Sequence, residues 1–277
     1  CIIPYRRGPE KSRPMAEVVD EVRTLAEQGL REIVLLGQIV DRYGLDRPAG
    51  EDLPALLRRV ARIDGVARVR FLTSHPSYLS EDLIRTVADC DGVCPHFEVP
   101  AQSGSDDILR AMRRGYTEAA YRDLVARIRD LCPGAAVHTD LIVGFPGETE
   151  AQFEKTAQLV RDLRFDKVHL AQYSVRPQTY AARRLPDDVA PDEKQRRWDV
   201  IDRLQRSILE ETQKQLEGDI VEVLVDGFDE RRGRWTEARR KYGTDIATTF
   251  DNVADPETVI YEVYLGAKLH DITDEAK

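Results

Sequence analysis

Segments with helical spacing of apolar residues alternate with short apolar runs over most of this 277-residue chain, and this alternation restricts the possible folds. A helix is expected from Pro14 to about Gly29, followed by a buried strand over 32–36. The order repeats four more times, with strands at 69–74, 96–101, 136–144 and 167–174 and helices at 52–64, 80–89, 105–113, 117–131 and 149–164. Such alternation predicts an α/β fold with a parallel sheet or barrel that binds ligands at the carboxyl ends of its strands.

The pattern changes after residue 174. Residues 175–191 are rich in proline and arginine, and 191–217 predicts one long helix. Beyond this helix, 219–226 and 258–265 alternate with a period of two, which is typical of half-buried strands. The sequence therefore predicts a small all-β module from about 218 to 277.

Charge and composition limit the function classes. The net charge of −9 has the wrong sign for a protein that binds nucleic acid over its whole surface, so an RNA-binding role would depend on local basic patches. No apolar run approaches the roughly 18 residues that a membrane helix needs, and no secretory signal opens the chain. A cytoplasmic protein without membrane contact is expected.

The cysteines do not predict a disulfide framework in a chain of this length and character. Cys90 and Cys94 are four residues apart, but no further pair of histidines or cysteines follows them. Both are expected to be small buried side chains rather than metal ligands.

Each predicted strand of the α/β part ends in a polar or glycine-rich cluster. The five clusters lie at 37–44, 74–76, 100–106, 139–149 and 173–177. Any one of them could be a turn or a helix cap, as for Ser105 with Asp106, or for Gly147 to Thr149. Five clusters at one rim of a parallel barrel favour a binding site, because function collects at that rim.

Three motifs resemble one known family. Residues 1–8 read Cys-Ile-Ile-Pro-Tyr-Arg-Arg-Gly, 102–106 read Gln-Ser-Gly-Ser-Asp with Arg-Gly-Tyr-Thr at 114–117, and 139–149 read Thr-Asp-Leu-Ile-Val-Gly-Phe-Pro-Gly-Glu-Thr. In this order they resemble the radical S-adenosylmethionine (SAM) methylthiotransferases over about residues 1–215. The loop after the first strand and the 102–106 segment resemble the MiaB-type branch, which modifies tRNA. Another branch, acting on threonylcarbamoyl-adenosine in tRNA or on a ribosomal-protein aspartate, is the alternative.

The resemblance implies a fold and its cofactors. Residues 1–215 would form an incomplete radical-SAM core, a partial (β/α)6 barrel whose first strand precedes the chain, and 216–277 a TRAM-like RNA-binding barrel. Cys1 would be the third cysteine of a CxxxCxxC motif that holds a 4Fe-4S cluster. An auxiliary cluster would occupy a separate N-terminal domain. On this view the 277-residue chain is expected to be an inactive fragment that holds no stable cluster, because one thiolate of three remains.

The resemblance also implies a reaction. A reduced cluster would cleave SAM to a radical that takes hydrogen from carbon 2 of N6-isopentenyladenosine at tRNA position 37, which becomes the 2-methylthio derivative. The partners would be the tRNA anticodon stem-loop and an electron donor such as flavodoxin or ferredoxin. Neither a catalytic residue nor the oligomeric state follows from the sequence.

Some site residues follow from the resemblance. SAM would contact Gly37 and Gln38 at its methionine end, Gln102 and Ser103 at its ribose, and the loop from Gly144 to Gly147 at its adenine. Asp140 could be a polar residue of the site or could bond backbone groups under the rim. His75 and His138 lack a nearby carboxylate or cysteine in the sequence and are expected to have structural roles.

A basic run with aromatic residues lies in the C-terminal module. It consists of Arg231, Arg232, Arg234, Trp235, Arg239, Arg240 and Lys241. This composition suits phosphate contact and base stacking, so the run is predicted to bind RNA, with a solvated loop as the alternative.

The sequence departs from the family in three places. Ile39 and Asp41 replace two asparagines of the loop after the first strand, and 176–181 lack a glycine and a proline of the related family segment. The module matches the TRAM pattern poorly after about residue 235. These departures leave the exact nucleoside open, and a non-catalytic RNA-binding remnant is the alternative from another class.

Overall fold

The computed structural model describes residues 10–37, 39–48, 50–215, 219–229, 234–240, 246–250 and 260–265, the last four ranges as backbone. The chain divides into two compact units, Cys1–Ile208 and Leu209–Lys277. The boundary along the chain falls within the long helix α9 (Pro191–Lys214). Each unit has its own sheet or sheets, and the candidate site lies in the first unit.

Five parallel strands form the centre of the first unit. They are β1 (Glu32–Leu36), β2 (Arg68–Leu72), β3 (His96–Glu98), β4 (Ala136–Val143) and β5 (Lys167–Gln172). β1 pairs with β2, while β4 pairs with β3 on one side and β5 on the other, and a single bridge from Val69 to Val93 joins the two groups. The spatial order follows the chain order, as in an arc of a barrel, whereas a doubly wound sheet reverses its order. The predicted five-stranded parallel α/β architecture is confirmed.

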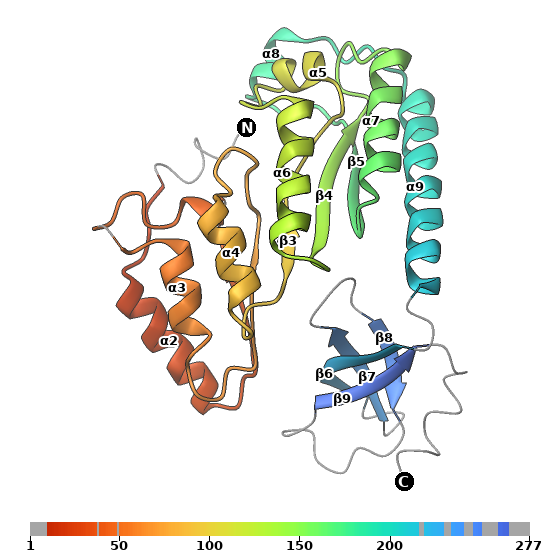
Figure 1. The fold of residues 1–277 in the computed structure, drawn as a ribbon. Coiled ribbons are helices and arrows are strands. Elements are labelled where there is room, and N and C mark those ends of the chain that lie inside the picture. Colours follow the sequence, from red (N-terminus) through yellow and green to blue (C-terminus); the bar gives the residue numbers. More distant parts are fainter. Residues whose placement is uncertain are drawn as a thin grey trace. The chain divides into compact units, whose positions relative to one another are not determined.

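The helices form a layer in which neighbours along the chain are also neighbours in space (Figure 1). The long ones besides α9 are α2 (Met15–Glu27), α3 (Leu53–Val60), α4 (Glu81–Asp89), α6 (Glu118–Leu131) and α7 (Glu150–Leu163). Contacts run from α2 to α3, from α3 to α4 and from α4 to α6. Within the residues described, none of the helices has the combined length and apolarity to cross a membrane.

Short helical elements occur where the sequence predicted only loops. The 3₁₀ turn η1 (Val40–Arg42) follows β1, and α8 (Tyr180–Arg184) lies in the proline- and arginine-rich segment after β5. The predicted helix at 105–113 is shorter, as α5 (Asp106–Ala111). All three elements lie beyond the carboxyl ends of strands, so they shape the rim of the barrel.

Helix caps fix where the chain turns back from the rim. Thr149 begins α7 with a full capping box, in which Gln152 reaches back to its backbone, as the cluster at 147–149 predicted. Ser105 occupies the cap position of α5, but its side chain makes no cap hydrogen bond. The predicted cap position is therefore confirmed without its side-chain bond, and the Asp106 carboxylate accepts from the Glu118 N–H at the start of α6 at 2.7 Å.

Four strands end earlier than predicted, and for β2 and β3 the local reason is visible. β2 ends at Leu72 because Thr73 has left-handed backbone, with φ of 70°. β3 ends at Glu98, close to Pro100, which has no N–H to continue a ladder. Gln102 returns to the sheet through a bridge to Leu141. The chain between strand and rim is therefore irregular but anchored.

The second unit carries an antiparallel sheet with the order β8-β7-β6-β9. Its strands are β6 (Asp219–Asp229), β7 (Arg234–Arg240), β8 (Ile246–Phe250) and β9 (Ile260–Leu265). The strands predicted at 219–226 and 258–265 correspond to β6 and β9. β7 was not predicted, because arginine and glutamate on neighbouring positions hide the alternation that marks a strand.

Candidate functional site

The carboxyl ends of three neighbouring strands lead into left-handed backbone. The residues are Thr73 after β2, Gln102 after β3 and Gly144 after β4, with φ of 70°, 68° and 71°. Such backbone costs a threonine or glutamine free energy and persists only where surrounding contacts fix it. The Val40 N–H donates to the Thr73 carbonyl at 3.1 Å, and the Gln102 N–H donates to the Asp140 carbonyl at 2.8 Å. Adjacent loops thus hold each other, and the rim is a preorganised candidate site.

The strand residues that alternate with the core residues form an inner face, opposite the helices. This inner face is rich in charged and titratable side chains: Glu32, Arg68, Arg70, His96, Glu98, His138, Asp140, Lys167 and His169. Arg70 forms a buried ion pair with Glu32 at 2.9 Å. A polar inner face bounded by a strained rim can bind a polar ligand, whereas the helix-facing side is an apolar core.

A histidine pair occupies the middle of the inner face. Nε2 of His96 and Nδ1 of His138 are 2.9 Å apart, and the His138 ring centroid lies 6.1 Å from that of His169. Burial lowers the pKa of His96 to about 4 and that of His138 to about 3, so both rings are neutral at neutral pH. His75 accepts a hydrogen bond from the Ser77 N–H at 3.2 Å. The structural roles predicted for His75 and His138 agree with these contacts.

Glu98 and Asp140 lie beyond the histidine pair, toward the rim. Burial raises the pKa of both carboxyls, and for Glu98 the charge of Asp140 adds to the rise. The charges of His169 and Arg114 oppose the rise for Asp140. Within the residues described, the Asp140 carboxylate makes no hydrogen bond to a backbone group. Of the two roles that the sequence allowed for Asp140, this favours a residue that faces the site.

Asp41 links the loops after β1 and β2. One oxygen, Oδ2, accepts a hydrogen bond from the His75 N–H at 2.9 Å, while Oδ1 is buried and has no partner among the residues described. Burial raises the pKa of this carboxyl to about 6, against the smaller opposing effect of its hydrogen bonds. Asp41 is therefore a buried carboxyl beside the rim whose ionised form is disfavoured by burial.

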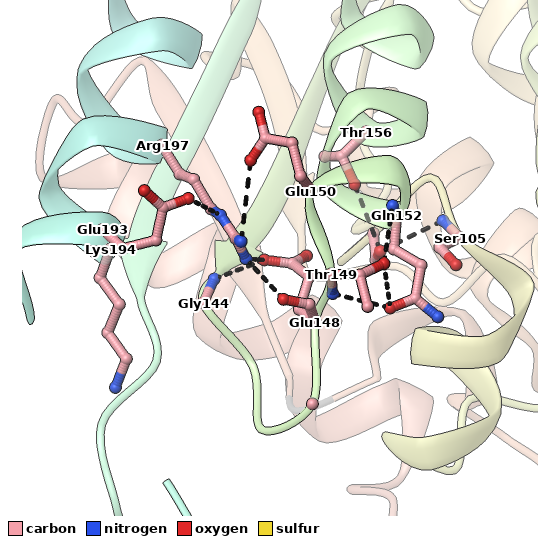
Figure 2. Close-up of polar contacts among 12 residues, drawn as sticks. Ser105, Gly144, Glu148, Thr149, Glu150, Gln152, Thr156, Glu193, Lys194 and Arg197 are labelled. Atoms are coloured by element: carbon pink, nitrogen blue, oxygen red, sulfur yellow. Dashed lines mark hydrogen bonds and ion pairs between the residues drawn. The ribbon is translucent and has the colours of Figure 1, made fainter. Parts of the chain in front are cut away.

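The loop from Gly144 to Glu148 is held by a buried ion pair (Figure 2). The Glu148 carboxylate accepts from the Gly144 N–H at 2.7 Å and from Arg197 of α9 at 2.8 Å. A Cβ on Gly144 would lie 2.3 Å from Cγ of Lys194, so this glycine is required by packing. At Gly147 the same position is open, but the Gly147 N–H already donates to the Asp188 carboxylate at 2.7 Å.

The segment after β3 is fixed to α7. The Thr156 hydroxyl accepts from the Gly104 N–H at 2.9 Å and lies 3.3 Å from the Ser103 hydroxyl, which in turn accepts from the Ser105 N–H at 3.2 Å. Figure 2 shows Thr156 and Ser105 at this junction. A Cβ on Gly104 would clash with the Lys155 carbonyl at 2.5 Å. The Ser103 side chain therefore already bonds within the fold. Of residues 102–105, Gln102 alone has left-handed backbone.

The structure brings together part of the predicted SAM site. Asp140 lies near the carboxyl end of β4, while Gly37, Gln102, Gly144 and Gly147 lie one to four residues past the carboxyl ends of β1, β3 and β4. Gln38 and Cys1 lie outside the described residues, as do Arg231, Arg232 and Lys241 of the predicted RNA-binding run. Arg234, Trp235, Arg239 and Arg240 belong to β7, where Trp235 is paired with Phe228 and Phe250.

Sequence reasoning missed Glu98 and Thr73. Glu98 could have been found from strand alternation, because a charged residue within an apolar strand signals a polar inner face. Nothing in the sequence marks the left-handed backbone of Thr73, since threonine is among the residues that avoid it.

Comparisons with known proteins now identify the family. Residues 1–160 match the family model of the Radical SAM superfamily. The chain belongs to the radical SAM superfamily. One solved structure, a methylornithine synthase (PylB), resembles the fold with a TM-score of 0.52 and 15% identity over 74% of this chain and 57% of that one. The α/β radical-SAM fold predicted from the sequence is confirmed.

Curated relatives within the superfamily share one enzyme name. A tRNA-2-methylthio-N(6)-dimethylallyladenosine synthase of Herpetosiphon aurantiacus is 48% identical over 85% of this chain and 54% of its own length. Proteins with the same name from Dehalococcoides mccartyi and Pelotomaculum thermopropionicum are 47% and 43% identical, over 85% and 99% of this chain and 56% and 60% of theirs. The predicted MiaB-type resemblance is confirmed. The chain spans about half the length of the first of these relatives.

The superfamily implies a 4Fe-4S cluster and SAM, and the residues described can be compared with each. A SAM site needs polar groups, and the rim offers the Asp140 carboxylate and the Ser74 hydroxyl, which has no hydrogen-bond partner among the described residues. These residues fit SAM. A cluster needs thiolates.

The described cysteines lie elsewhere: Cys94 is buried, as predicted, Cys90 is only half-buried where a buried side chain was predicted, and Cys132 is buried. Among the described residues no group of three or more potential ligands could hold a metal ion, so they do not supply the cluster's ligands.

Proposed function

We propose that the chain is the core of a tRNA methylthiotransferase that converts N6-isopentenyladenosine at position 37 to its 2-methylthio derivative. The observation that carries this proposal is the 43–48% identity to synthases of that name, which extends over 85–99% of the chain. The strand-end rim with its polar inner face supports it, because that is where a parallel barrel binds its ligands.

The chain's own residues would bind and orient the reactants. When bound, the cluster and SAM supply the hydrogen-abstraction chemistry of the superfamily. Asp140 and Glu98, as carboxylates that only accept hydrogen bonds when ionised, would orient hydroxyl or amino groups of a ligand above the inner face. The histidine pair and the Arg70–Glu32 ion pair fill the space below and would limit entry of water.

For the domains, we infer that residues 1–215 are the radical-SAM core and 216–277 a TRAM-like RNA-binding barrel. The antiparallel sheet and the basic composition of 231–241 support this, as does the Pelotomaculum relative, whose similarity extends over 99% of the chain. Arg234, Arg239 and Arg240 would contact tRNA phosphates there. A tRNA substrate also implies a cytoplasmic enzyme, with a small electron-transfer protein such as flavodoxin or ferredoxin as donor.

The proposal is tested in the organism that encodes the protein. Mass spectrometry of tRNA nucleosides from a deletion strain should show loss of 2-methylthio-isopentenyladenosine and accumulation of isopentenyladenosine. Unchanged 2-methylthio-isopentenyladenosine would refute the assignment. A loss of the 2-methylthio derivative of threonylcarbamoyladenosine instead would show that the substrate is that of the alternative branch.

A further inference from the structure

Two arginine-rich segments, far apart in the chain, meet at the rim. Arg113 and Arg114 follow α5, while Arg176, Arg183 and Arg184 lie between the end of β5 and the end of α8. The Arg113 guanidinium lies over the Tyr180 ring, 3.7 Å from its centroid, and this contact joins the segments. Figure 1 likewise shows α5 and α8 side by side. These five arginines and Tyr180 are called the rim arc below.

The positive charge of the rim arc is not neutralised within the described part of the chain. None of its five arginines forms an ion pair there, whereas Arg110, on the preceding turn of α5, is paired with Asp107 at 3.0 Å. The nearest acids after α8 are engaged elsewhere, since Asp187 binds Lys194 at 2.6 Å and Asp188 accepts from the Gly147 N–H at 2.7 Å. In a protein of net charge −9, this is a local basic surface beside the candidate site.

Aromatic rings continue the rim arc around the site. Tyr180 is 43% exposed and Tyr78 is 42% exposed, so both offer ring surface to a ligand. His75 lies between Tyr78 and Tyr116, with ring centroids 5.3 and 5.6 Å away. Exposed aromatic rings beside unpaired arginines are the combination on which unstacked bases and phosphates of single-stranded RNA bind.

We propose that the rim arc binds the single-stranded loop of an RNA hairpin, with its arginines on phosphates and Tyr180 under one unstacked base. A single-stranded loop is favoured over a duplex because a duplex hides its base faces from Tyr180. Burial raises the pKa of Asp140 and the charge of Arg114 opposes that rise, so the basic surface lies near this carboxylate of the inner face. An RNA loop on the rim arc would therefore hold its target nucleoside over the site. The identity of that loop as the anticodon loop rests on the proposed function.

The test measures binding of a synthetic anticodon stem-loop to the full-length protein over a range of salt concentrations, with a blunt RNA duplex of the same length for comparison. The triple variant Arg113→Gln, Arg176→Gln, Arg183→Gln should bind the hairpin at least roughly tenfold more weakly, and its slope of log K against log salt should fall by about 2. The matched triple variant Arg59→Gln, Arg127→Gln, Arg203→Gln removes three exposed arginines outside the rim arc and should keep both values.

Tyr180 gives a second, uncharged test. Tyr180→Ala should weaken hairpin binding roughly tenfold, with an unchanged salt slope, while Tyr180→Phe keeps the ring and the affinity. Duplex binding should not respond to either substitution. Urea unfolding of each variant checks that the fold is intact, as expected for exposed side chains.

The outcomes separate this inference from the proposed function. If the rim-arc variants bind the hairpin as tightly as the wild type, or lose hairpin and duplex binding equally, the inference is wrong, and the nucleoside analysis of the deletion strain still stands. If that nucleoside analysis fails while the rim-arc variants specifically lose hairpin binding, the RNA-loop surface is supported and the substrate assignment is refuted.

Discussion

Replacing Asp41 by asparagine should stabilise the protein at neutral pH. The amide keeps an acceptor for the His75 N–H but removes the charge that burial disfavours. The pKa of Asp41 is about 6 in the folded protein against an ordinary value of 3.8. Because the folded pKa is raised, ionisation lowers the free energy of unfolding as the pH rises from about 4 through 6. Linkage gives a cost of about 3 kcal/mol at pH 7.5 and about 1 kcal/mol at pH 4.5.

The assay is urea unfolding of wild type and Asp41→Asn at both pH values. The stability gain of the variant over wild type should be larger at pH 7.5 than at pH 4.5, by about 2 kcal/mol. Taking the difference between the two proteins removes the opposite pH dependence of His96 and His138, whose lowered pKa values destabilise the fold as the pH falls below about 6.5. A difference in unfolding free energy that stays constant across this pH range, or a variant less stable than wild type at pH 7.5, would show that burial does not disfavour the ionised Asp41.

Other substitutions test the loops that hold the rim. Gly147→Ala should lower the free energy of unfolding by about 1 kcal/mol, because alanine disfavours left-handed backbone. Gly144→Ala should lower it by at least about 2 kcal/mol more, because its Cβ would also meet the buried Lys194 side chain. Equal shifts in the melting temperature of the two variants would contradict this. Thr156→Val should lower the urea-derived stability by about 1–3 kcal/mol, because a buried backbone N–H loses its acceptor; no measurable loss would mean that the bond is dispensable. Arg197→Met should cost about 3–5 kcal/mol by leaving the Glu148 carboxylate unpaired, and adding Glu148→Gln should recover part of that loss; additive losses would argue against the buried pair.

Patterns that reach over several residues were predictable from the sequence. The five parallel strands and the long helices follow from apolar spacing, and the rim clusters follow from the rule that parallel strands end together. Thr149 was predictable as a cap because threonine followed by glutamine at the third position is a capping box.

Features set by tertiary contacts were not predictable. The left-handed backbone of Thr73 depends on hydrogen bonds from neighbouring loops, and the raised pKa of Asp41 depends on burial that no local pattern reveals. Ser105 holds the cap position of α5, but its hydroxyl is buried and has no hydrogen-bond partner among the described residues. The contact between Arg113 and Tyr180 joins segments that the sequence separates, so the rim arc was invisible before the fold was known.

The most direct measurement of the central claim is the nucleoside content of tRNA from a deletion strain complemented with variant genes. The wild-type gene and the Arg127→Gln gene should restore 2-methylthio-isopentenyladenosine, whereas Asp140→Leu should leave only isopentenyladenosine at comparable protein levels. Full restoration by Asp140→Leu would contradict the site at the rim, and no change on deletion of the gene would contradict the function itself.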